Sequence, residues 1–291
     1  MTREEFARLT ESGLLLLDGG MGSSLRKAGM PVGVCTELWA QEHPEIVIEL
    51  QSAYVDAGSR IVYAPSFMAN REGLSMYGLA DRLEEINRGA VALTRKAVGD
   101  RAYVAGDVTT TGKVLEPKGP MRYNTLFGIY QEQIRCLADA GADLIAIETM
   151  LTLDETTVAL EAARSVCDLP VLCTMTIMSD GELYYGGSVY EAVETLQELG
   201  ADAVGVNCSV GPDQLESVVS GMKAIAKVPL VVKPNAGMPE IDAQGTAHYS
   251  MQPEAFANAM RKLAWRGANL IGGCCGTTPE YIRLLKERVL D

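Results

Sequence analysis

Short apolar segments alternate with amphipathic segments along most of the chain. Eight runs of five or six residues are almost continuously apolar and rich in β-branched side chains. Runs of this kind are typical of strands that are covered on both faces, as in parallel sheets. The expected strands are 14–18, 60–64, 103–107, 144–148, 171–176, 203–208, 230–234 and 269–274.

Each expected strand is followed by a segment whose apolar residues recur at helical spacing. In the segment 44–57, for example, Ile46, Val47, Leu50 and Tyr54 follow that spacing. Several segments begin with an acidic residue or proline and end at glycine, which are common helix start and stop signals. The expected helices are 44–57, 83–98, 126–140, 154–166, 189–199, 212–226, 253–265 and 279–290.

Eight strand-then-helix units predict a (β/α)₈ TIM barrel. The alternative is a doubly wound parallel sheet, which usually carries a G-x-G-x-x-G turn after its first strand. The segment 19–22 reads Gly-Gly-Met-Gly and does not fit that pattern. No low-complexity linker divides the chain, so we expect a single domain over residues 1–291.

Three connections are longer than a barrel needs, at 23–42, 108–124 and 235–252. All three follow expected strands, so they belong to the C-terminal face of the barrel. Barrel enzymes carry their active sites on that face. We therefore expect the functional residues at the C-terminal ends of the strands.

Composition and charge restrict the function further. The chain has 291 residues and a net charge of −13, without any basic run, which argues against a nucleic-acid partner. Residues 1–13 lack the apolar core of a secretory signal, and no stretch of about 18 apolar residues offers a membrane span. We expect a cytoplasmic protein, in which seven scattered cysteines are core residues or metal ligands rather than a disulfide framework.

Three cysteines lie at expected strand ends. Cys208 ends one strand, and the adjacent pair Cys274 and Cys275 ends another within a glycine-rich segment. Three thiolates bind Zn²⁺ at about 2.3 Å each and leave the fourth tetrahedral position open, as in catalytic sites. A thiol bound there would be deprotonated and nucleophilic. The alternative is that they are buried core cysteines, which is our interpretation of Cys136, Cys167 and Cys173; the role of Cys35 is left open.

Polar residues at the other strand ends suggest a binding site for an amino acid. The segment 18–23 follows the first expected strand, and its glycines allow backbone N–H groups to surround an anion. Asp18 and Glu148 together suit an ammonium group, although a turn-capping role for Asp18 and a buried salt bridge for Glu148 are alternatives. Asp107 and the threonines after it either line the same opening or cap a turn. Neither His43 nor His248 is placed as a catalyst.

Taken together, the motifs resemble the zinc-dependent homocysteine S-methyltransferases over nearly the whole chain. The motifs are Asp-Gly-Gly-Met-Gly at 18–22, Ile-Glu-Thr at 147–149, Gly-Val-Asn-Cys at 205–208 and Gly-Gly-Cys-Cys-Gly at 272–276. The resemblance implies a (β/α)₈ barrel with Cys208, Cys274 and Cys275 as zinc ligands. It also implies that Glu148 and Asp18 bind the amine of homocysteine and that amides near Gly20 and Met21 bind its carboxylate. Asn235 would lie beside the metal, either as a substrate contact or as a displaceable fourth ligand.

Within that family, the chain is most similar to the homocysteine-binding module of cobalamin-dependent methionine synthase. The segments 66–71 and 233–239 carry this similarity, whereas Ala-Pro-Ser-Phe at 64–67 departs from it. The folate, cobalamin and reactivation modules of such an enzyme do not fit in 291 residues. We therefore expect methylcobalamin on a separate corrinoid protein as methyl donor. The alternatives are a small donor such as S-methylmethionine, another thiol acceptor, or a non-catalytic subunit; the oligomeric state is left open.

Overall fold

Eight parallel strands surround a common axis in the computed structural model, which describes residues 1–242 and 247–290. They are β1 (Leu15–Leu16), β2 (Ile61–Tyr63), β3 (Tyr103–Val108), β4 (Leu144–Met150), β5 (Val171–Met175), β6 (Ala203–Cys208), β7 (Leu230–Pro234) and β10 (Leu270–Ile271). Each of them lies where the sequence predicts a strand. The pairing order is β1-β10-β7-β6-β5-β4-β3-β2.

The two ends of this order meet, so the sheet closes on itself. Leu17 pairs in parallel with Ile61, and the backbone N–H of Arg60 donates to the carbonyl oxygen of Leu16 at 2.7 Å. The (β/α)₈ barrel that the sequence predicts is therefore confirmed. The doubly wound alternative is wrong, because such a sheet would leave its first and last strands as open edges.

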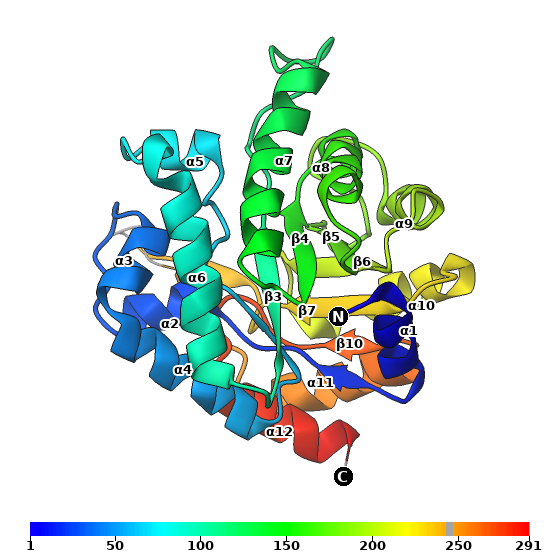
Figure 1. The fold of residues 1–291 in the computed structure, drawn as a ribbon. Coiled ribbons are helices and arrows are strands. Elements are labelled where there is room, and N and C mark those ends of the chain that lie inside the picture. Colours follow the sequence, from blue (N-terminus) through cyan, green and yellow to red (C-terminus); the bar gives the residue numbers. More distant parts are fainter. Residues whose placement is uncertain (243–246, 291) are drawn as a thin grey trace.

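Helices cover the outside of the barrel (Figure 1). The barrel helices are α4 (Pro44–Ala57), α6 (Leu83–Val98), α7 (Tyr123–Asp139), α8 (Leu153–Val166), α9 (Val189–Glu198), α10 (Glu216–Ile225), α11 (Pro253–Trp265) and α12 (Pro279–Val289). Shorter ones are α1 (Arg3–Glu11), α2 (Met21–Lys27), α3 (Thr36–Glu42), α5 (Arg71–Ser75) and the 3₁₀ turns η1 (Ala80–Arg82) and η2 (Pro212–Gln214). None of the helices in the described parts of the chain is long and apolar enough to cross a bilayer.

Two predicted helices differ from the observed ones by more than one residue at an end. The helix predicted at 126–140 begins earlier, at Tyr123. The backbone is extended at Arg122, immediately before it. The helix predicted at 212–226 is divided into η2 and α10. Leu215, between them, has a ψ of −1° and buries its side chain. The 3₁₀ turn ends there, and the regular helix starts at Glu216.

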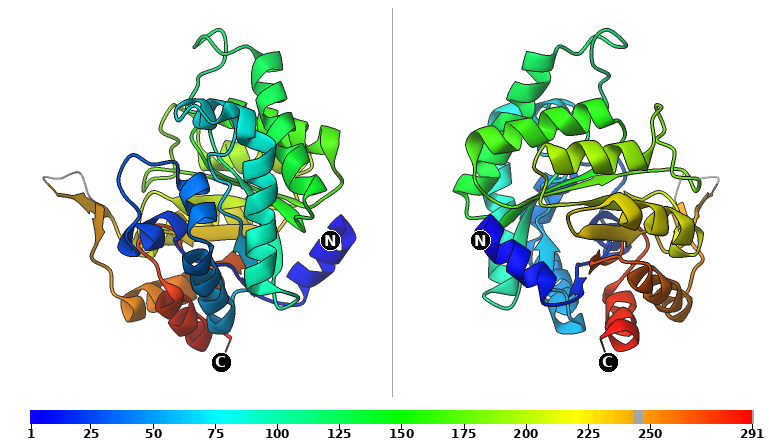
Figure 2. Two further views of the ribbon diagram at one scale, coloured as in Figure 1. Left: turned by 60° about the vertical axis from the view of Figure 1, so that its left-hand side comes forward. Right: turned by 90° about the vertical axis from the view of Figure 1, so that its right-hand side faces the viewer.

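Two of the long connections carry structure of their own. The first, 23–42, contains most of α2 and all of α3. The third, 235–252, contains the antiparallel pair β8 (Pro239–Ile241) and β9 (Ala247–Tyr249); its residues 243–246 lie outside the described residues. Figure 2 shows this hairpin projecting from one side of the molecule, with α1 on the other side.

The inside of the barrel is apolar at its N-terminal end. Phe6 of α1 packs there with inward-facing strand residues such as Leu15, Leu144 and Leu270, and only 1% of Phe6 is exposed. Arg3 holds α1 in place through an ion pair with Asp202 at 2.7 Å. Helix α1 therefore closes the end of the barrel opposite the predicted site.

Removing the Phe6 ring should destabilise the barrel without affecting its C-terminal end. We expect Phe6→Ala to lower the free energy of unfolding by about 3–5 kcal/mol, because it leaves a cavity in a closed core. Urea denaturation measures this change. Arg8→Ala, an exposed position on the same helix, is the control and should change stability by less than about 0.5 kcal/mol. Equal effects of the two changes would contradict this role of Phe6.

Candidate metal and amino-acid site

Three cysteine sulfur atoms come together at the C-terminal end of the barrel. Cys208 ends β6, and Cys274 with Cys275 follows β10; their sulfur atoms all lie within 4.8 Å of one another. All three side chains are half-buried. Within the described residues, no other cluster of histidine, cysteine and acidic side chains meets the same criterion. The structure thus places side by side the three cysteines that the sequence singles out.

The other four cysteines lie away from this cluster, in positions that fit structural roles. Cys173 is buried in β5, while Cys136 in α7 and Cys167 after α8 are half-buried. Cys35, which the sequence left open, is buried at the start of α3, and its thiol donates to the Glu37 carboxylate at 3.3 Å.

Unusual backbone conformations surround Cys208. Cys208 and Ser209 have φ values of +59° and +62°, and Thr149 at the end of β4 has +58°. Such values are uncommon for residues other than glycine and persist where neighbouring contacts hold them. Asn207 supplies those contacts for Thr149, since its Oδ1 accepts from the Thr149 N–H at 2.7 Å and its Nδ2 donates to the Thr149 hydroxyl at 2.7 Å.

Asn235 joins the two halves of the cysteine cluster. It follows β7, which lies between β6 and β10, and is 2% exposed. Its Oδ1 accepts from the backbone N–H of Cys275 at 3.0 Å, and its Nδ2 donates to the carbonyl oxygen of Ser209 at 3.1 Å. Asn235 therefore fixes Cys275 relative to the turn that carries Cys208.

Glycines allow the chain to pass closely around the cysteine pair. A Cβ atom on Gly272 would lie 2.6 Å from the carbonyl oxygen of Asp18. Gly276 has a φ of +82°, and a Cβ there would lie 2.4 Å from the ring of Tyr249. Both positions thus require glycine for the pair to keep its place.

Tyr249 is a site residue that the sequence does not reveal. It belongs to β9, and its side chain interacts with Cys275 and lowers the pKa of that thiol. The connection 235–252 is recognisable as a long C-terminal loop, but nothing in its sequence shows which residue the hairpin brings back to the cysteines.

The three thiols do not titrate independently. Hydrogen bonds from Cys208 and Cys274 to the Cys275 sulfur lower the pKa of Cys275 far below its usual value, against the effect of burial. The hydrogen bond with Cys208 is also the largest reason that the pKa of Cys274 is raised. These hydrogen bonds therefore favour the thiolate form at Cys275 over the other two cysteines.

A buried acidic cluster lies at the same end of the barrel. Asp18 and Glu148, which the sequence proposes for an ammonium group, are 1% and 7% exposed. Lys233, which the sequence analysis missed, lies between them: its Nζ is 2.8 Å from Asp18 Oδ1 and 3.9 Å from Glu148 Oε2. The two clusters are connected, because the backbone N–H of Gly273 donates to the carbonyl oxygen of Asp18 at 3.0 Å.

Asp107 adds a third buried carboxylate. Burial, followed by the charge of Glu148, raises its pKa well above the usual value. Burial also raises the pKa of Glu148 to about 7, although the charge of Lys233 opposes this shift. Three carboxylates thus share one lysine in a region with little water.

The predicted anion site is partly occupied by the protein itself. The N–H of Gly20 donates to the Thr277 hydroxyl at 3.0 Å. Helix α2 begins at Met21, so the amides of its first turn have no acceptor within the helix. The role of Gly20 and Met21 in binding a carboxylate stays a prediction, for which the first turn of α2 offers the free donors.

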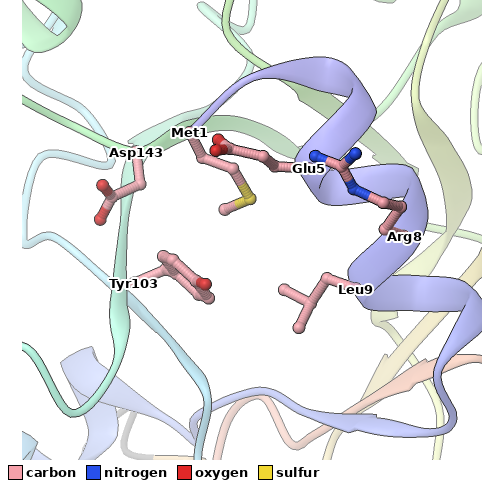
Figure 3. Close-up of a pocket in the computed structure, with 6 residues that line it drawn as sticks. All are labelled: Met1, Glu5, Arg8, Leu9, Tyr103 and Asp143. Carbon is pink, nitrogen blue, oxygen red and sulfur yellow. The ribbon is translucent and has the colours of Figure 1, made fainter.

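The two histidines lie outside both clusters. His43 stacks on Trp39 with ring centroids 4.0 Å apart, and exposed His248 has its Nε2 2.7 Å from Asp242. The surface pocket in Figure 3 is also separate from the site. It has a volume of about 570 Å³ and lies near the N-terminal strand ends, where Leu9, Tyr103 and Asp143 contribute to its lining.

Comparisons with known proteins point to one family. The family profile described as homocysteine S-methyltransferase matches residues 15–289. The methionine synthase of Mycobacterium tuberculosis (strain ATCC 25618 / H37Rv) is 30% identical in an alignment that covers 94% of this chain. The methionine synthase of Mycobacterium leprae (strain TN) is 29% identical, with 91% of this chain covered. The chain spans about a quarter of their length, 24% and 23%.

Two solved structures of the homocysteine methyltransferase MmuM from Escherichia coli are also similar. Its oxidized form has a TM-score of 0.81 and 25% identity, with 97% of this chain and 98% of that chain covered. Its metallated form has a TM-score of 0.80 and 24% identity over the same shares of the two chains.

The lowered pKa of Cys275 predicts that an alkylating reagent modifies this cysteine selectively. In protein stripped of metal, iodoacetamide should modify Cys275 at pH 6 about tenfold faster than Cys136, whose pKa is raised by burial. Because its pKa is lowered, the rate at Cys275 should change little between pH 6 and pH 8. Mass-spectrometric peptide mapping measures both rates. A rate at Cys275 that climbs toward pH 9, as for an ordinary thiol, would contradict the charge distribution.

Proposed function

This chain belongs to the homocysteine S-methyltransferase family, and we propose that it catalyses the zinc-dependent transfer of a methyl group to homocysteine, forming methionine. The observation that carries the proposal is the position of the three cysteines beside the buried acidic cluster at one end of the barrel. We assign this activity to one homocysteine-binding domain over residues 1–291. Thiolate ligands require reduced cysteines, which favours a cytoplasmic location.

The donor set fits Zn²⁺. Thiolates are soft ligands that suit this ion, and a tetrahedral site with Zn–S distances of about 2.3 Å needs sulfur atoms about 3.8 Å apart. Cys208, Cys274 and Cys275 lie within 4.8 Å of one another and come from backbone that Asn235 holds together. The metallated form of the similar E. coli enzyme gives further support. When bound, the ion would supply a Lewis acid that keeps a substrate thiol deprotonated.

The remaining residues would bind and orient the amino-acid part of homocysteine. The acidic cluster around Asp18 and Glu148 suits its ammonium group, and the first amides of α2 suit its carboxylate. The substrate sulfur would then lie at the cysteine cluster, next to Asn235. After the thiol has lost its proton, the homocysteine sulfur forms a bond to the methyl carbon while the bond between that carbon and the donor breaks. Tyr249 would limit the charge on Cys275 through its interaction with that side chain.

We propose a methylcobalamin carried by a separate corrinoid protein as the methyl donor. Exposed apolar side chains occur on several of the loops that follow strands, at the C-terminal end of the barrel. They are Val32, Met68, Met76, Tyr77, Met178, Tyr184, Tyr185, Met238 and Ile241. Such side chains would be available to contact a partner protein. The similarity to methionine synthases is further support for such a donor.

Each of the three cysteines should be required for zinc. We expect Cys208→Ala, Cys274→Ala and Cys275→Ala each to lower the zinc content from about one ion per chain to near zero, because two thiolates hold the ion far less tightly than three. Elemental analysis after dialysis measures this content. Cys136→Ala is the control and should keep its zinc. Full zinc and undiminished homocysteine binding in Cys274→Ala would show that the assignment is wrong.

A donor panel tests the origin of the methyl group. Methionine formation from homocysteine is measured with methylcobalamin, a methylated corrinoid protein, S-methylmethionine and betaine. The corrinoid protein should be the best donor, and Tyr185→Ser should slow this reaction while leaving that with free methylcobalamin unchanged, because Tyr185 would contact only the carrier protein. Faster transfer from S-methylmethionine would contradict the proposed donor. No methionine with any donor would favour a non-catalytic subunit.

A further inference from the structure

The upper layer of the barrel interior is polar, unlike the apolar layers beneath it. Strands β2, β3, β4 and β7 contribute Tyr63, Asp107, Glu148 and Lys233 to this layer, and each of the four is more than nine-tenths buried. Asp18, at the end of the first strand, joins them. The layer therefore holds three carboxyl groups and one amine.

Lys233 already serves as the cation for Asp18. Its Nζ lies 2.8 Å from Asp18 Oδ1 and 3.6 Å from the centre of the Tyr63 ring, a cation–π contact. The other oxygen of Asp18 accepts from the Tyr63 backbone N–H at 2.8 Å. Both oxygens of Asp18 are thus bound by the protein, and a second ammonium group beside Asp18 would be repelled by Lys233.

The other two carboxylates are left without enough donors. Among the residues that the structure describes, Asp107 Oδ1 and Glu148 Oε2 are buried without a hydrogen-bond partner. Lys233 Nζ lies 3.9 Å from Glu148 Oε2, too far for a hydrogen bond. Unpaired buried carboxylate oxygens are costly, so each is a position where a bound cation would be strongly favoured.

Asp107 and Glu148 are also neighbours. Asp107 pairs in register with Ala146 on the adjacent strand, and Glu148 is two residues farther along, on the same face of the strand. The two carboxylates therefore lie next to each other on the inner wall, on strands adjacent in the sheet.

We infer that Glu148 and Asp107 bind the ammonium group of the substrate. Lys233 occupies the position beside Asp18 where that group would otherwise lie. This inference rests on the proposed function, because it takes homocysteine as the substrate. It makes Asp107 a substrate-binding residue and Lys233 a positioning residue, which keeps the incoming amine off Asp18. It also makes the site selective for a thiol that carries an amine.

Binding of two thiols to the zinc-loaded full-length protein tests the inference. The probes are L-homocysteine and 4-mercaptobutanoate, which has the same carboxylate and thiol but no amine, and calorimetry gives both dissociation constants. Asp107→Asn should weaken homocysteine binding at least about tenfold, by loss of a charge-assisted hydrogen bond, and leave 4-mercaptobutanoate within about twofold. Asp139→Asn, an exposed acid on α7, is the matched control and should change neither constant.

The possible failures are distinct. If the wild-type protein binds homocysteine but Asp107→Asn weakens both probes equally, or neither, the inference is wrong and the proposed function stands. If the wild-type protein prefers 4-mercaptobutanoate, Lys233 has replaced the substrate amine altogether, which also overturns the inference. If it binds neither probe, the proposed function fails together with the inference.

A second variant tests the part assigned to Lys233. In a Lys233→Gln background, Asp18 becomes available to the substrate amine. Asp107→Asn should then weaken homocysteine binding by less than about threefold, compared with about tenfold in the wild-type background. An unchanged tenfold loss would show that Lys233 does not decide which carboxylates bind the amine. If the variant does not fold, the Asp107→Asn comparison still decides the main inference.

Discussion

The site depends on one neighbour relation in the closed sheet: β7 lies between β6 and β10. Because of this order, Asn235 at the end of β7 reaches both cysteine-bearing turns and hydrogen-bonds to each. Cys208 lies 66 positions before Cys274 and 67 before Cys275 in the sequence, and the strand order β6-β7-β10 is what brings the three sulfur atoms within 4.8 Å of one another. The pairing of β1 with β10 places the first strand, and with it Asp18, directly beside the cysteine pair.

A change of polarity within the barrel interior gives the site its chemistry. The lower layers are apolar and closed by Phe6, whereas the upper layer carries Asp18, Asp107, Glu148 and Lys233. Charges in such a poorly hydrated layer interact strongly, so an unequal number of acids and bases favours binding of a further cation. The cysteine cluster lies directly next to it. Together they suit a substrate with an ammonium group at one end and a thiol at the other.

The sequence predicted the parts of this arrangement that follow from strand periodicity. Strand ends of a barrel converge, so Cys208, Cys274, Cys275, Asp18 and Glu148 were recognisable as one group. Lys233 was missed although a lysine within the apolar run 230–234 was a visible signal. Burying it requires a charged partner, and Asp18 is 215 positions away. Asp107 was noticed, but its unpaired oxygen depends on side-chain packing.

Two further features had no signal in the sequence. Tyr249 reaches Cys275 only through the pairing of β8 with β9, and residue types do not determine that register. The positive φ values of Thr149, Cys208 and Ser209 depend on hydrogen bonds made between β4, β6 and β7. Local propensity favours other conformations at these residues, and the tertiary contacts override it.

The central claim is that the three cysteines hold an ion whose remaining position accepts the sulfur of homocysteine. Zinc X-ray absorption spectroscopy on the loaded protein, with and without L-homocysteine, counts the sulfur atoms around the ion directly. The account predicts three sulfur ligands in the free protein and four in the complex, at distances of about 2.3 Å. An unchanged count of three in the presence of saturating homocysteine would contradict it.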